Sequence, residues 1–353
     1  MTDKRTIRRI VTLIIVFAGT LCLAWGHFGE LKSEGHTASN RAKPNHQYCR
    51  KDIIFKSHDL QAPILFAHRG GVLDMPESTE KAFSHALNVA KVDVLELDVQ
   101  LTKDAKIVVW HGPDLDDVYI EGQSIHAKER PLGKRNIYEY DWSELAGKAW
   151  VADPGTTSLE HVLKDKKGRE LLLLSQFLNK FPTAPLNIEL KSSFKNNLGS
   201  HNGLAGNIAE FVKVLDAGKY ARDIIVASAS YAIIEAFRTQ SGERYVTNLT
   251  WWEQLKLFFT SPDLQNRALE TVYHEFIASE FLIGKVRRLG GSTYVFLTAY
   301  GPFSSIDVDP QERQIMNILD RGVDGIMTDS PSTVRTIINT WKQERCTLSE
   351  HAQ

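Results

Sequence analysis

The sequence predicts an α/β fold, a (β/α)8 TIM barrel with enlarged loops, and three observations support this prediction. From residue 63 onward, short apolar runs of strand length alternate with helix-like stretches, as in parallel β-sheets. Eight such runs fall within roughly 290 residues, a length that suits this barrel. Unusual polar residues gather where the runs end, which is where barrel active sites lie. A doubly wound sheet is the alternative, but no glycine-rich dinucleotide loop follows the first run.

The composition is that of a folded protein and excludes some functional classes. The chain has 353 residues, of which 42% are hydrophobic and 24% charged. Its 42 Lys and Arg residues balance 43 Asp and Glu residues, giving a net charge of −1. Binding to nucleic acid requires a surplus of basic residues, so we expect no nucleic-acid partner. Three cysteines are too few for a disulfide-dense scaffold and form no zinc-binding cluster.

Residues 1–26 form a separate basic and apolar segment. Four basic residues and one acidic residue give its start a net charge of +3, and residues 10–25 are uncharged and mostly apolar. This pattern predicts a signal peptide or a transmembrane signal anchor, with a possible cleavage site after Gly26. A buried amphipathic helix is the alternative, although no polar stripe interrupts the run. The positive-inside rule places residues 27–353 outside the cytoplasm, either membrane-anchored (periplasmic or extracellular) or, after cleavage, secreted.

The remainder divides into a polar tether over residues 27–60 and the barrel over residues 61–345. Cys49 and Cys346 flank the folded region. In an oxidising compartment they could form a disulfide if the two ends of the fold lie close together. Two unpaired thiols are an equally good interpretation, because the sequence does not show this distance.

The barrel elements follow from the order of apolar runs along the chain. The predicted strands are residues 64–67, 94–99, 107–110, 186–190, 224–227, 245–248, 294–298 and 325–327. Helical patterns fill most of the intervals, including residues 78–90, 206–215 and 332–341, with Pro331 near the first turn of the last helix. Two connections, residues 112–185 and 250–292, are longer than a simple loop requires. Loops of this length are usually functional or covering elements.

Three acidic residues lie in predicted strands whose ends should meet. Glu96 and Asp98 are two residues apart and therefore face the same side of the second strand, and Glu189 lies in the fourth. Three carboxylates at one mouth are tolerable only if they are protonated, paired or bound to a cation. Their oxygen atoms suit Ca²⁺ or Mg²⁺. A solvated face is the alternative, which the apolar neighbours of Glu96 and Asp98 make less favourable.

Two histidines and two basic residues occur at the same strand ends. His68 and His111 follow the first and third strands and suit general acid–base catalysis near neutral pH. Arg69 and Lys191 supply fixed positive charge for an anionic phosphate. A structural histidine, or a Lys191 that only pairs with Glu189, is the plainer interpretation. The clustering of all these residues at strand ends favours a site.

Six stretches resemble the glycerophosphodiester phosphodiesterase family, and the resemblance spans residues 63–340. They are FAHRGG at 66–71, PEST at 76–79, LELDVQLTKD at 95–104, IVVWH at 107–111, LNIELK at 186–191 and GVDGIMTDSP at 322–331. The resemblance implies a barrel that hydrolyses a glycerophosphodiester to an alcohol and glycerol phosphate, using one divalent cation, Ca²⁺ or Mg²⁺. It further implies that Glu96, Asp98 and Glu189 bind the metal, that His68 and His111 form the acid–base pair, and that Arg69 and Lys191 hold the phosphate.

Several positions depart from the family pattern and affect the expected substrate. Gly112 replaces an acidic residue after His111, and Leu297 and Tyr300 replace a Trp and an Asn that shape the pocket for glycerol. Trp251, Trp252 and the Phe258–Phe259 pair begin a long connection at the expected active-site face. This aromatic segment could hold an acyl chain or enter a bilayer interface, or it could pack into the protein's own core.

These departures leave alternative functions open. A lysophospholipid is the second candidate substrate, which would make the chain a lysophospholipase D-type enzyme at a membrane. A catalytically silent barrel that binds lipid headgroups is a third hypothesis, and a metal-dependent sugar isomerase is a fourth with no matching motif. The sequence makes no prediction of oligomeric state.

Overall fold

The structure is a computed structural model that describes residues 49–123, 134–153, 165–195, 202–217, 224–242, 244–272, 278–297 and 311–346. Contacts divide the chain into residues 1–43 and 44–353, and the described residues all belong to the second unit. Within them, no helix is both long enough and apolar enough to cross a membrane. The predicted signal or anchor segment, residues 1–26, lies outside the described part of the chain.

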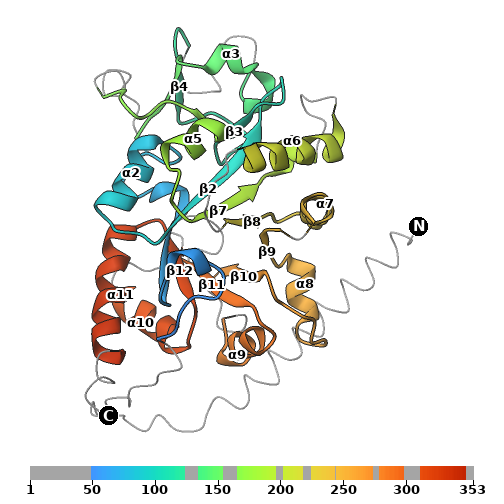
Figure 1. Cartoon of the computed structure of the whole chain (residues 1–353). Coiled ribbons are helices and arrows are strands. Elements are labelled where there is room, and N and C mark those ends of the chain that lie inside the picture. Colours follow the sequence, from blue (N-terminus) through green and yellow to red (C-terminus); the bar gives the residue numbers. More distant parts are fainter. Residues whose placement is uncertain are drawn as a thin grey trace, which may run out of the picture. The chain divides into compact units, whose positions relative to one another are not determined.

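Eight parallel strands close into a ring, which confirms the predicted TIM barrel (Figure 1). In order around the ring they are β1 (Ile64–Ala67), β2 (Val94–Leu101), β7 (Leu186–Leu190), β8 (Ile224–Ala227), β9 (Val246–Asn248), β10 (Arg267–Val272), β11 (Ser292–Leu297) and β12 (Gly325–Thr328). Closure comes from β1, which pairs with β12 on one side and with β2 on the other.

Two strand predictions are wrong, and both errors have a physical reason. The run at residues 107–110 is not a barrel strand: β3 (Ile107–Val109) pairs antiparallel with β2, outside the ring, and carries β6 (Leu172–Leu173) on its other edge. Only a tight turn separates β2 from β3, and a parallel crossover needs a dozen or more residues. The missing barrel strand is β10, which lies inside the connection predicted as one long loop.

The helices cover the outside of the ring, and those predicted at residues 78–90, 206–215 and 332–341 are confirmed. Their bounds are α2 (Glu80–Asn88), α5 (Leu174–Lys180), α6 (Gly203–Ala217), α7 (Tyr231–Ser241), α8 (Trp251–Lys256), α9 (Glu280–Arg288), α10 (Gln311–Asp320) and α11 (Pro331–Arg345). In β2, Leu95, Leu97 and Val99 belong to the core between strands and helices. Alternation along the strand therefore turns Glu96 and Asp98 to the barrel interior.

Residues 49–63 close the end of the barrel opposite the mouth. Phe55 is fully buried there, with its ring 5.9 Å from that of Phe66 in β1 and 6.4 Å from that of Tyr294 in β11. The Asp52 carboxylate accepts hydrogen bonds from the Phe55 backbone N–H and the Tyr294 hydroxyl. Residues 49–60, which the sequence analysis assigned to the tether, are thus packed against the barrel.

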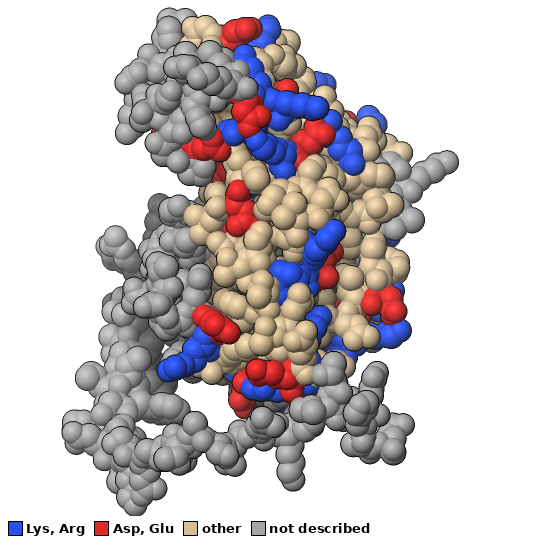
Figure 2. Space-filling view, turned by 90° about the vertical axis from the view of Figure 1, so that its left-hand side faces the viewer, with Lys and Arg blue, Asp and Glu red and all other residues tan. Residues whose placement is uncertain are grey.

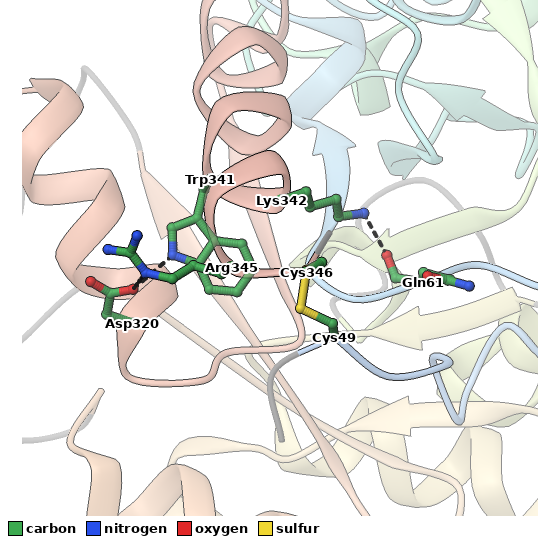
Figure 3. Close-up of a disulfide and its surroundings, with 7 residues drawn as sticks. All are labelled: Cys49, Gln61, Asp320, Trp341, Lys342, Arg345 and Cys346. Atoms are coloured by element: carbon green, nitrogen blue, oxygen red, sulfur yellow. Dashed lines mark hydrogen bonds and ion pairs between the residues drawn. A yellow bond between two sulfur atoms is a disulfide. The ribbon is translucent and has the colours of Figure 1, made fainter. Parts of the chain in front are cut away.

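A disulfide joins the two ends of the fold. Cys49 bonds to Cys346, which follows α11, so the pairing alternative holds (Figure 3). Beside it, the Lys342 ammonium donates to the Gln61 carbonyl at 2.8 Å. The bond closes a loop across a sequence separation of 297 residues.

The long connection at residues 112–185 builds a small layer of its own. It contains an antiparallel pair, β4 (Val118–Ile120) and β5 (Ala149–Val151), with η5 (Ile137–Glu139) and α3 (Trp142–Leu145). These elements enclose a separate core that includes Leu115, Tyr140 and Leu145, and Figure 1 shows them at the upper end of the molecule. Among the described residues on the face drawn in Figure 2, basic and acidic side chains are interspersed.

Candidate active site

A sharp turn after β1 places His68 and Arg69 at the mouth of the barrel. The turn η2 (His68–Gly70) follows the strand directly. Arg69, Gly70 and Gly71 all have positive φ angles, between 52° and 93°. The two glycines adopt this backbone conformation without steric strain because they lack a Cβ. The turn directs the Arg69 backbone N–H at the Glu96 carboxylate, at 2.7 Å. The HRGG sequence therefore connects the first strand to the acidic residues of the second.

The three predicted acidic residues converge. Asp98 of β2 lies directly beside Glu189 of β7 in the sheet register, and Glu96 lies one inward position deeper. One ligand oxygen from each of Glu96, Asp98 and Glu189 falls within 4.8 Å of the other two. This geometry brings together the residues that the sequence placed on two separate predicted strands.

Two cations partly balance these acids. The Arg69 guanidinium lies 2.9 Å from Glu77 and 3.3 Å from Asp98. The Lys191 ammonium lies 2.7 Å from Asp98 and 2.9 Å from Glu189. Glu77, in the PEST stretch at 76–79, thus supports Arg69. With Glu77 included, four carboxyl groups face two fixed cations, so the site retains a surplus of negative charge when all are ionised.

The pKa directions reflect this surplus. Burial raises the pKa of Glu96 well above its usual range, and the neighbouring Asp98 charge raises it further. Burial and the Asp98 charge likewise raise the pKa of Glu189, against the pull of Lys191. Burial also acts to raise the pKa of Asp98, but Lys191, His111 and Arg69 outweigh it and bring the value to about 2. Asp98 is therefore the carboxylate that stays ionised.

The donor set fits one hard divalent cation. Oxygen ligands at the 2.3–2.6 Å typical of Ca²⁺ can lie no more than about 5 Å apart, and the observed cluster meets this limit. Both carboxylate oxygens of Asp98 are buried and make only ion pairs, without a hydrogen bond of good geometry to any described residue. Their remaining lone pairs, and the surplus of negative charge, are what a divalent cation would satisfy.

The two predicted histidines have different neighbours. His68 Nδ1 lies 2.6 Å from the carboxylate of Asp329, which follows β12. His111 follows β3, which pairs antiparallel with β2. The Gln100 side chain donates to the His111 backbone carbonyl at 2.9 Å and holds that backbone in place. Burial, with a smaller contribution from the charges of Lys191 and Arg69, lowers the pKa of His111 to about 3, against the effect of Asp98. His111 is therefore neutral at physiological pH.

Two functional candidates were not identified from the sequence. Asp329 lies in the GVDGIMTDSP stretch at 322–331, within which no residue was given a role, and its contact with His68 crosses 261 residues. Glu270 lies in β10, the strand that was missed, and accepts a hydrogen bond from Asn187 at 2.5 Å. Burial raises the pKa of Glu270 to about 8, and the charge of Glu189 contributes. Its only sequence signal is an acidic residue within a half-apolar run.

The structure places Leu297, at the end of β11, away from the candidate site. Leu297 packs in the core between strands and helices, not in the barrel interior. The ring of its neighbour Phe296 instead lies 6.0 Å from the His68 ring, edge-on. Tyr300 lies outside the described residues.

Comparison with known proteins gives consistent results. The family model described as "Glycerophosphoryl diester phosphodiesterase family" matches residues 68–333. A glycerophosphodiester phosphodiesterase of Caldanaerobacter subterraneus is 45% identical over 275 residues, covering 78% of this chain and 97% of its own. Human lysophospholipase D GDPD1 is 26% identical over 302 residues, covering 78% of this chain and 86% of its own.

The fold is also similar to solved structures. A phosphodiesterase of Oleispira antarctica, solved with its product sn-glycerol-3-phosphate, matches with a TM-score of 0.54 at 17% identity, over 78% of this chain and 97% of that one. A glycerophosphodiester phosphodiesterase of Agrobacterium tumefaciens matches with a TM-score of 0.54 at 18% identity, over 78% and 99% of the two chains.

Proposed function

Because the chain belongs to the glycerophosphoryl diester phosphodiesterase family, we propose that it hydrolyses a glycerophosphodiester to an alcohol and glycerol phosphate, with one divalent cation and two histidines. The observation that carries this proposal is the convergence of Glu96, Asp98 and Glu189 beside two cations and two histidines at one end of the barrel. Such a set of charges suits an anionic phosphate held by positive groups.

Glu96, Asp98 and Glu189 are the proposed ligands of one Ca²⁺ or Mg²⁺ ion. When bound, such an ion neutralises charge that develops on the phosphate oxygens. The protein adds its own positive groups, since Arg69 and Lys191 are held at the mouth by the same carboxylates. We assign both to the phosphate, where their charges stabilise the transition state more than the ground state.

The two histidines are proposed to divide the proton transfers. His111 is neutral and can accept a proton from the attacking hydroxyl, whether this belongs to water or to the substrate. The Asp329 carboxylate holds the Nδ1–H of His68, which fixes the ring and leaves Nε2 to act on the substrate. His68 is then the group that protonates the departing alcohol oxygen.

A substrate panel tests the proposed reaction. The full chain is incubated with diesters of choline, ethanolamine and inositol, with Ca²⁺ and with Mg²⁺, and the released alcohol and glycerol phosphate are quantified. We expect stoichiometric release of both products, and its loss in Glu96→Gln. If no diester is turned over while a metal-dependent ligand still binds, the chain is a silent headgroup-binding barrel instead.

A lysophospholipid is the second candidate substrate, and exposed aromatic residues beside the mouth favour it. Trp251 and Trp252 are each more than half exposed at the start of α8, which follows β9. Relatives named lysophospholipase D cover most of this chain. Lysolipid forms of the same three headgroups therefore belong in the panel, and a preference for them over the short diesters would make this the principal activity.

We also propose that the barrel works outside the cytoplasm. The Cys49–Cys346 disulfide supports this location, because such bonds persist in oxidising compartments. The basic and apolar residues 1–26 would direct the chain there as a signal or an anchor. Fractionation of cells that express the full chain tests this, and a cytoplasmic barrel with reduced cysteines would contradict it.

A further inference from the structure

Helix α8 presents its two tryptophans to solvent. Trp251 and Trp252 are 55% and 56% exposed, and Phe259, in the turn after the helix, is 90% exposed. Helix α8 and that turn thus present large aromatic residues to water with little cover. A soluble surface rarely groups such residues, and contiguous exposed apolar patches usually mark interaction sites.

Two polar residues of α8, Glu253 and Gln254, point inward and hold the helix in this orientation. Glu253 caps the helix through Thr250 and forms a 2.7 Å ion pair with the buried Arg238. Gln254 donates to the backbone carbonyls of Leu249 and Glu270. These contacts fix the helix, so its aromatic face is held outward by the fold.

The exposed face lies beside the proposed active site. In a TIM barrel each helix starts at the mouth and runs back along the ring. Trp251 follows β9 after only two intervening residues, which places the tryptophans at the mouth rim. The helix is also connected to the barrel, because the Gln254 side chain donates to the backbone carbonyl of Glu270 in β10.

The charge on this face complements an anionic surface. Lys256 is exposed one turn after Trp252, whereas the only carboxylate of α8, Glu253, is turned inward and paired with Arg238. The solvent-facing side of α8 therefore has two tryptophans and a positive charge, and the acidic residue of the helix does not lie on it. Indole rings favour the lipid–water boundary, because one end is apolar and the other donates a hydrogen bond, and lysine reaches the headgroups while its stem stays apolar.

From this arrangement we propose that Trp251, Trp252, Lys256 and Phe259 dock onto an anionic lipid–water interface and hold the mouth of the barrel against it. We call these four residues the docking face. The proposal rests on the proposed function for the identity of the substrate, since docking would deliver a lipid phosphodiester directly to the site. The binding itself requires no turnover.

Fluorescence quenching tests the docking directly. The full chain is mixed with vesicles of phosphatidylcholine and phosphatidylglycerol that carry bromine in their acyl chains, which quenches nearby indoles. Trp251→Phe/Trp252→Phe should lose a quenched component that the wild type shows. Trp142→Phe removes a half-buried indole from α3 and serves as the matched control, with no change in the quenched component. Equal quenching in the double variant and the wild type would overturn the proposal.

A kinetic comparison connects docking to substrate. For Trp251→Ser/Trp252→Ser we expect KM for a lysolipid in anionic vesicles to rise about tenfold, with kcat/KM for a water-soluble diester unchanged. Val89→Ser removes an exposed apolar residue at the far end of α2 and should alter neither value. An equal loss on both substrates would contradict docking. So would a change in the sedimenting mass of the protein without vesicles, because the face would then bind a second copy.

Absence of turnover on every substrate would overturn the proposed function alone. The quenching result would still decide the docking, since it depends only on where the two indoles lie.

Discussion

At the residue scale, His68 and His111 differ in their surroundings, although both were predicted to have the same kind of acid–base role. His68 has a carboxylate partner in Asp329, whereas burial, reinforced by nearby positive charges, keeps His111 neutral. A proton donor to the leaving group matters less when that group leaves readily, whereas a base is needed in either case. The two roles can therefore be separated by the choice of leaving group.

We expect His68→Gln to lower kcat/KM for a choline diester by about 10²–10⁴ but to lower it far less for a p-nitrophenyl diester. His111→Gln should lower both by similar factors. Rates with the two substrates, measured for each variant, test the division. A His111 variant that is rescued by the activated leaving group would reverse the assignment.

A second prediction at the residue scale concerns Glu270, whose pKa is about 8, compared with an ordinary value of 4.5. Between these values the folded protein keeps a proton that the unfolded chain has lost, so the free energy of unfolding falls as pH rises. Glu270→Gln has no carboxyl group to lose a proton, so its free energy of unfolding does not fall with pH in this way. We expect the variant to gain roughly 1–3 kcal/mol relative to the wild type between pH 5 and pH 8.

Urea unfolding at both pH values measures this gain. Glu210→Gln, on the exposed side of α6, is the control and should follow the wild type. If Glu270→Gln also follows the wild type at both pH values, Glu270 does not hold a proton in the folded state.

The residues of the candidate site could be predicted to different degrees. Glu96 and Asp98 were placed together because alternation along one strand is readable in the sequence. The contact between His68 and Asp329 could not be predicted, since the two residues are 261 positions apart and meet only when the ring closes. The same holds for the Cys49–Cys346 bond, whose feasibility depends on where the fold brings its two ends.

At the scale of elements, the two wrong strand predictions have opposite causes. β10 was missed because Arg267 and Glu270 interrupt its apolar run, and Glu270 is tolerated there because it faces the polar interior of the barrel. β3 was taken for a barrel strand because all three of its residues are buried, between β2 and β6. Hydrophobic runs report burial, but they do not say on which side of the ring a strand lies.

The start of α2 provides a prediction at this scale. Thr79 is buried, and its hydroxyl accepts from the Ala82 N–H while donating to the Pro76 carbonyl. Thr79→Ala removes the hydroxyl that the Ala82 N–H and the Pro76 carbonyl both bind. The substitution should lower the free energy of unfolding by about 1–2 kcal/mol. Thr340→Ala, on the exposed side of α11, is the comparison and should cost far less. Equal denaturation midpoints for the two variants would contradict the capping role.

At the scale of the whole molecule, the Cys49–Cys346 bond ties residues 49–63 to α11 and closes nearly the entire barrel into one loop. Such a crosslink limits the unfolded chain and typically contributes 2–4 kcal/mol. Cys346→Ser should therefore lower the free energy of unfolding by about this amount. Cys22→Ser, outside the described residues, should leave it unchanged.

Unfolding of the oxidised full chain with and without a reducing agent checks this value independently. The reducing agent should bring the wild type to the stability of Cys346→Ser and leave that variant unaffected. A reduced wild type as stable as the oxidised one would mean that the bond adds nothing.

The central claim is that Glu96, Asp98 and Glu189 bind one divalent cation on which phosphodiester hydrolysis depends. The most direct measurement strips the full chain with a chelator and then follows both bound metal and turnover of a glycerophosphodiester as Ca²⁺ or Mg²⁺ is added back. We predict that activity vanishes on stripping and returns as one ion binds per chain, and that Asp98→Asn neither binds the ion nor recovers. Full turnover in the chelated protein, or unchanged metal binding in Asp98→Asn, would contradict the account.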